Sequence, residues 1–195
     1  MSEHPENLID VEEIARLMKQ AGKLSVSTGY ILFWWGLLLT AASLIGRFLL
    51  DNESELFQYI FPATCLIGWL GGVIVNRTFK LKSRDGEVAY GNSVSRSVWV
   101  ASGLVITSLL VLNFLGYQAS EDSLFSIVAL VCAISLVATA AACETNILFF
   151  AASGWAATAI YAYALPATTE ALLVYSAAAC FLFLALPGLS IALRR

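Results

Sequence analysis

The side chains of this chain that are best suited to bind or react lie in the connecting segment 76–96. The segment reads NRTFKLKSRDGEVAYGNSVSR and is the only long polar stretch between apolar runs. Clustered lysines and arginines attract lipid phosphates and acidic protein surfaces. The segment therefore predicts a docking surface for anionic lipid head groups or for a partner protein. Its candidate residues are Arg77, Lys80, Lys82 and Arg84.

A second cationic group lies in the polar leader, residues 1–27. Asp10 and Glu13 fit a capping box. Apolar residues then recur at three- and four-residue steps, which predicts an amphipathic helix over 10–25. Such a helix lies on the inner membrane surface with its cations toward lipid phosphates, or it docks a partner protein. The cations on its polar face are Arg16, Lys19 and Lys23.

This sequence contains few residues that could bind a metal or catalyse a reaction. The chain has one histidine, His4, and four cysteines, none of them in a Cys-x-x-Cys pair. A zinc or haem site would need more such ligands. No metalloprotease, hydrolase or phosphate-loop motif occurs either. We therefore expect a non-enzymatic protein without a cofactor, and no basic surface argues for nucleic acid.

Polar residues within the apolar runs leave a second function open. Between Ser97 and Leu193 the runs carry no Lys, Arg, His, Asp or Glu. Ion-coupled transporters usually keep such a group in the membrane, so proton-coupled transport is not expected. A small transporter or channel for a neutral or apolar solute stays the alternative, because hydroxyls either line a path or join helices. The residues in question are Ser102, Thr107, Ser108, Asn113, Ser135, Thr139, Ser153, Thr158 and Ser176.

Membrane-spanning helices must position all of these groups. Of the 195 residues, 59% are hydrophobic and 13% are charged, whereas soluble domains carry about 25% charged residues. The apolar residues fall in six runs, and a helix of roughly 20 such residues crosses the bilayer. We expect an all-α integral membrane bundle over 28–195, with the last span broken near Pro187-Gly188. The spans cover about 28–50, 58–76, 97–117, 123–143, 146–165 and 171–193.

The basic residues also predict an orientation. Ten of the eleven lysines and arginines fall on one side of this arrangement; the exception, Arg47, can reach the outer surface and pair with Asp51. Because the Lys/Arg bias of loops marks the cytoplasmic side, we expect both termini and a basic loop over 77–96 to be cytoplasmic. No cleavable signal peptide is apparent. Compact loops favour a bacterial inner membrane.

Small residues predict where helices approach closely. Gly68 and Gly72 have a Gly-x-x-x-Gly spacing, and Gly154 lies within the fifth span. Such positions let another backbone come near. We expect internal packing here, and a homo-oligomer is the alternative. In sequence the spans pair as three hairpins across short outer loops.

Several local features together resemble an uncharacterised family of small bacterial membrane proteins with six spans. They are Tyr30 with Trp34, Trp35 and Gly36, then Pro62 with Gly71-Gly72, then Trp99 after the basic loop, and Pro187-Gly188. The resemblance covers the chain from about Ile14 to its end. It implies the fold and an inner-membrane location, and it brings no activity.

Two functions follow from these observations. The first is a non-enzymatic membrane protein that scaffolds or regulates a cytoplasmic or membrane partner through its inner face. The second is the small transporter or channel.

Overall fold

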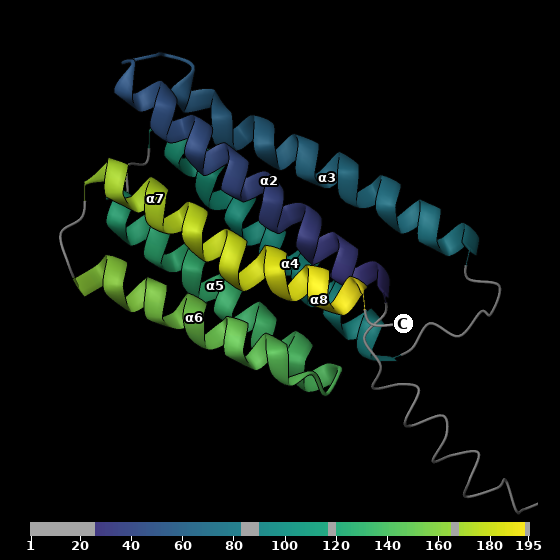
Figure 1. Cartoon of the computed structure of the whole chain (residues 1–195). Helices are drawn as coiled ribbons and strands as arrows, with labels where there is room; N and C mark the ends of the chain where they lie inside the picture. Colours follow the sequence, from purple (N-terminus) through teal and green to yellow (C-terminus); the bar gives the residue numbers. More distant parts are fainter. Residues whose placement is uncertain (1–25, 83–89, 117–119, 165–167, 194–195) are drawn as a thin grey trace, which may run out of the picture.

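Six long helical segments build the computed structural model, which describes residues 26–82, 90–116, 120–164 and 168–193 (Figure 1). Each of the six is long and apolar enough to cross a membrane. The predicted all-α architecture with six candidate membrane spans is therefore confirmed, whereas the helix expected over 10–25 lies outside the described residues. The segments are α2 (Val26–Asp51), α3 (Phe57–Lys82), α4 (Tyr90–Phe114), α5 (Glu121–Ala142), α6 (Asn146–Ala164) and a last span made of α7 (Thr169–Cys180), η2 (Phe181–Ala185) and α8 (Leu186–Ala192).

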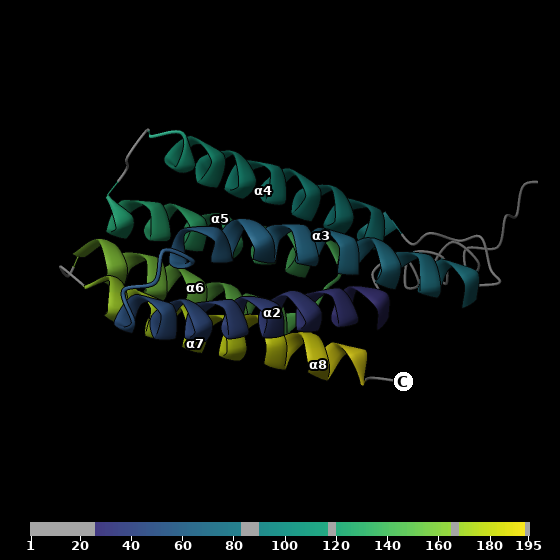
Figure 2. The ribbon, with the colours of Figure 1, turned by 90° about the horizontal axis from the view of Figure 1, so that it is seen from above.

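Consecutive segments run antiparallel, so charged residues collect at two opposite ends of the bundle (Figures 1 and 2). We call them the basic end and the acidic end. The described charges of the basic end are Arg77, Lys80, Lys82, Arg96 and Glu144. Those of the acidic end are Arg47, Asp51, Glu53, Glu55, Glu121, Asp122 and Glu170.

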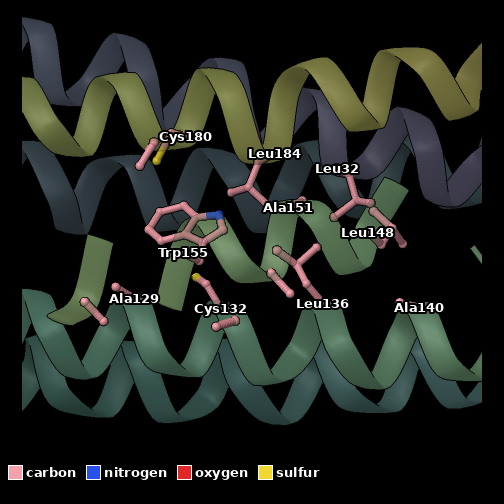
Figure 3. Close-up of a cluster of buried hydrophobic side chains, with 14 of the residues drawn as sticks. Leu32, Ala129, Cys132, Leu136, Ala140, Leu148, Ala151, Trp155, Cys180 and Leu184 are labelled. Atoms are coloured by element: carbon pink, nitrogen blue, oxygen red, sulfur yellow. The ribbon is translucent and has the colours of Figure 1, made fainter. Parts of the chain in front are cut away.

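The core lies where α5, α6 and the last span meet, and α2 packs along the last span (Figures 2 and 3). Helices α3 and α4 are peripheral, because α3 packs mainly on α2 and α4 mainly on α5. Only 11% of the apolar window of α3 and 6% of that of α4 is buried, against 50% for the last span. The buried core consists of aliphatic, cysteine and tryptophan side chains, including Leu32, Ala129, Cys132, Leu136, Leu148, Ala151, Trp155, Cys180 and Leu184.

Helix α2 meets the last span backbone to backbone. A Cβ added at Gly29 would lie 2.6 Å from the amide nitrogen of Ala192, and one at Gly36 would lie 2.7 Å from the Cα of Ala185. A Cβ at Gly188 would lie 2.9 Å from the carbonyl oxygen of Gly29. Real Cβ atoms stay farther away than this, so these three positions need glycine.

Hydroxyl groups join the same two segments nearer the acidic end. Ser43 Oγ donates to Ser176 Oγ over 3.1 Å. Thr40 Oγ1 donates to the carbonyl of Ala177 over 3.4 Å. Polar groups buried in a bilayer need partners, and these hydroxyls find them across the interface.

The last span continues through Pro187 instead of breaking there. The amide of Leu186 bonds the carbonyl of Phe181, five residues back, and forms the π turn η2. Proline has no N–H and its ring collides with the carbonyl four residues back in an α-helix. The wider π turn directly before Pro187 accommodates the ring and keeps the chain helical.

The helices beside the basic connection are longer than the predicted spans. Helix α3 runs to Lys82 and α4 begins at Tyr90. Much of the expected loop 77–96 is therefore helical. The basic end is built on two rigid helix ends and on the connection between them.

Candidate functional site

The strongest candidate site is the projecting end of α3. The apolar span of this helix ends at Val75, but the helix continues for two more turns, roughly 10 Å. This part reaches beyond α2 and α8 at the basic end (Figure 2). Arg77 and Thr78 are exposed there, and Arg77 makes no ion pair with any residue that the structure describes.

The structure places part of the predicted docking surface on this one helix end. Arg77, Lys80 and Lys82 lie within its last two turns. The other predicted docking residues lie outside the described part of the chain: Arg16, Lys19, Lys23 and Arg84.

Glu144 is the acidic residue of the basic end among those that the structure describes. It follows α5 in a left-handed conformation, with φ of 49°, and the amide of Thr145 closes the helix by bonding the carbonyl of Ala140 over 3.0 Å. Glycine is the usual residue at such a position, and a carboxylate is unfavourable near a helix C-terminus. No ion pair joins Glu144 to a cationic side chain among the described residues.

The predicted packing glycines contact aromatic rings of the same chain. The Trp35 ring lies against Gly68, and the Phe183 ring lies against Gly154. Gly72 is looser, because the nearest atom to an added Cβ is Trp35 Nε1 at 4.0 Å. A Cβ added at Gly71, beside it, would lie 2.5 Å from Trp34 Nε1. These close approaches occur within one copy of the chain.

A row of hydrogen-bonded side chains, the α4–α5 polar seam, attaches α4 to the bundle. It consists of Ser95, Trp99, Ser102, Ser135 and Thr139. Ser102 Oγ and Ser135 Oγ lie 2.6 Å apart. Trp99 Nε1 donates to Thr139 Oγ1 over 3.0 Å, and Ser95 Oγ donates to the same atom over 3.4 Å. These hydroxyls are therefore engaged in joining helices.

Replacing Thr139 with valine should destabilise the protein by about 1–2 kcal/mol. The change keeps the shape of the side chain but leaves Trp99 Nε1 and Ser95 Oγ without their acceptor. Thr158→Val is the matched control, since the Thr158 hydroxyl bonds the carbonyl of Gly154 in its own helix. Thermal unfolding in detergent measures the unfolding midpoint of each variant. Equal shifts for Thr139→Val and Thr158→Val would contradict an interhelical role of the Thr139 hydroxyl.

At the acidic end an ion-pair network ties α2 to α7. Arg47 pairs with Asp51 one turn later, as we expected from the sequence. Arg47 Nη2 also lies 3.2 Å from Glu170 Oε2, in the first turn of α7. The arginine is thus a structural link between two helix ends.

Metal-ligating side chains do not gather in the described part of the chain. Within it, no group of three or more His, Cys, Asp and Glu residues could hold a metal ion. The thiols of Cys132, Cys143 and Cys180 are free and buried, and that of Cys65 is free and half-buried.

These features define a class: an all-helical protein with six candidate membrane spans and charges separated between its two ends. Within this class, no known protein family, curated protein or solved structure matches the chain.

Proposed function

We propose that this protein is a non-enzymatic integral membrane protein that scaffolds or regulates a partner through its basic end. In this proposal the basic end and both termini face the cytoplasm of a bacterial inner membrane. The observation that carries the proposal is the projecting end of α3, which holds three cationic residues beyond the apolar span.

Charge and shape support this reading. A helix end that stands clear of its neighbours offers a surface to a second protein. Cations such as Arg77, which makes no ion pair among the described residues, favour an acidic segment of that protein and speed its association. The predicted helix over 10–25 would add Arg16, Lys19 and Lys23 to the same side of the membrane, where anionic lipid head groups also attract them.

The orientation rests on the rule that basic connections stay in the cytoplasm. A reporter enzyme that is active only in the periplasm tests it when fused after Leu193. We expect no reporter activity there, and strong activity after insertion near Glu55. The reverse pattern would overturn the orientation and the docking surface with it.

Removing the charges of the projecting helix tests the docking itself. The variant Arg77→Gln, Lys80→Gln, Lys82→Gln should lower partner recovery about tenfold when the full chain is purified in mild detergent and bound proteins are quantified. Glu53→Gln with Glu55→Gln is the control, because it changes charge at the acidic end and should leave recovery unchanged. Unchanged recovery with the triple variant would refute the proposal.

Passage of a neutral solute is the second candidate, and the α4–α5 polar seam favours it. Five buried or half-buried polar side chains line up between α4 and the rest of the bundle. If α4 moved away from α5, these groups would border a polar path. Glycerol uptake into proteoliposomes, compared with liposomes that contain Thr139→Val, tests this candidate.

A further inference from the structure

The facing sides of α3 and α4 form a surface that protein covers poorly. We define this α3–α4 face by Trp69 and Gly72 of α3 and by Arg96, Gly103 and Thr107 of α4. A Cβ added at Gly103 would lie 2.8 Å from Cζ2 of Trp69, so these sides of the two helices face one another. Arg96 and Thr107 lie seven residues before and four after Gly103, on the same side of α4.

Apolar surface is available along this face. Trp69, Gly72, Gly103 and Thr107 are all half-buried. Behind them the ring of Trp35 meets that of Trp69 edge to face, with centroids 6.4 Å apart. Elsewhere α3 and α4 hardly touch each other. The surface of this face is apolar where the Trp69 ring packs on the backbone of Gly103.

A cation, Arg96, lies at the basic end of this face, three residues inside the candidate span Ser93–Asn113. Arg96 is exposed and makes no ion pair with any residue that the structure describes. It lies roughly 10 Å along α4 from Gly103 and about 28 Å from Leu115, close to the thickness of the hydrocarbon layer. The positive end of the α4 dipole, which begins at Tyr90, adds to its charge.

We propose that the α3–α4 face binds one molecule of anionic phospholipid. Its phosphate pairs with Arg96, and an acyl chain lies over the outer edge of the face, across Trp69 and Gly103. Charge complementarity favours this occupant over a second copy of the chain, because a second copy would bring its own cations to the same end. The site does not use Arg77, so it is independent of the proposed partner docking.

Native mass spectrometry of the full chain in detergent tests the proposal by titration with phosphatidylglycerol or phosphatidylcholine. We expect the wild type to retain one phosphatidylglycerol and to bind phosphatidylcholine weakly. Arg96→Gln should weaken phosphatidylglycerol binding at least about tenfold, since a charge-assisted hydrogen bond to phosphate is lost. Arg96→Lys should keep most of the binding.

Arg77→Gln is the matched control. It removes one charge at the same end, but Arg77 lies on α3, eight residues after Trp69 and roughly 80° around the helix from it. Equal losses in Arg77→Gln and Arg96→Gln would indicate a diffuse basic surface and overturn the site. Equal binding of phosphatidylglycerol and phosphatidylcholine would also overturn the site. A dimer of the protein without bound lipid would do the same. Each variant is titrated only if its unfolding midpoint matches that of the wild type. If Arg96→Gln does not fold, Arg96→Lys is titrated in its place.

Discussion

Gly188→Ala should destabilise the protein by about 3 kcal/mol and lower the yield of folded material sharply. The added methyl would lie 2.9 Å from the carbonyl oxygen of Gly29 and 2.9 Å from the carbonyl carbon of Leu32. Both atoms belong to the α2 backbone, which cannot rotate aside as a side chain can. The two helices would have to separate along their whole contact. Thermal unfolding in detergent, followed by size-exclusion elution, measures the loss.

Gly72→Ala is the matched control for this prediction. It makes the same chemical change in another span, but the nearest atom to the new methyl is Trp35 Nε1 at 4.0 Å. Because alanine favours a helix over glycine by about 1 kcal/mol, we expect unchanged or slightly raised stability. Comparable losses in both variants would show that backbone contact between α2 and α8 is not what makes Gly188 sensitive.

Trp155→Ala should cost about 3–5 kcal/mol. Trp155 is only 2% exposed, and its ring lies in the core between Cys132 and Cys180, with Leu184 nearby (Figure 3). Truncation would leave a large cavity at the junction of α5, α6 and the last span. The unfolding midpoint in detergent reports the change, with Ile160→Ala as control on the same helix, since Ile160 is 67% exposed.

A second variant at Trp155 tests the role of its indole nitrogen. Trp155 Nε1 is buried and has no hydrogen-bond partner within the described residues. An unpaired buried donor is itself unfavourable. Trp155→Phe removes the donor while filling most of the space, so it should cost clearly less than Trp155→Ala. Equal costs for the two variants would mean that ring packing at this site contributes little.

The spans were predictable because the signal is carried by composition. Long apolar runs interrupted by Asp51, by the basic connection and by Glu144 leave few other arrangements in a bilayer. Which spans pack together was not predictable in the same way. The sequence pairs the fifth span with the sixth, yet α6 packs chiefly on α5, and the last span packs chiefly on α2.

The reason lies in how close packing is encoded. Gly68 and Gly72 have a recognisable spacing, but Gly72 is loosely packed. Gly29 and Gly36, which hold tight backbone contacts, lie seven residues apart on one face of α2, but Gly188 has no second glycine in its span. Close approach depends on a small residue of one helix meeting the backbone of another, and a single helix pattern does not contain that information.

The candidate site was predictable in part. Arg77, Lys80 and Lys82 were identified as a cationic group, although as residues of a loop. Segment 76–82 contains no proline or glycine, so nothing in it ends the helix, and α3 carries these residues outward. Arg96 was counted with the same loop and missed as a separate position. Its seven-residue spacing from Gly103 is the signal that could have revealed it.

The π turn in the last span has a consequence for how this protein can vary. A π turn holds one residue more than an α-helical turn, so the two halves of the span are set in register with α2 independently. The outer half is matched through Ser176, and the inner half through Gly188. Deleting one residue from 181–185 would return this turn to α-helical geometry and bring the carbonyl four residues back against the ring of Pro187. Length in this short stretch is therefore under tighter constraint than the identity of its side chains.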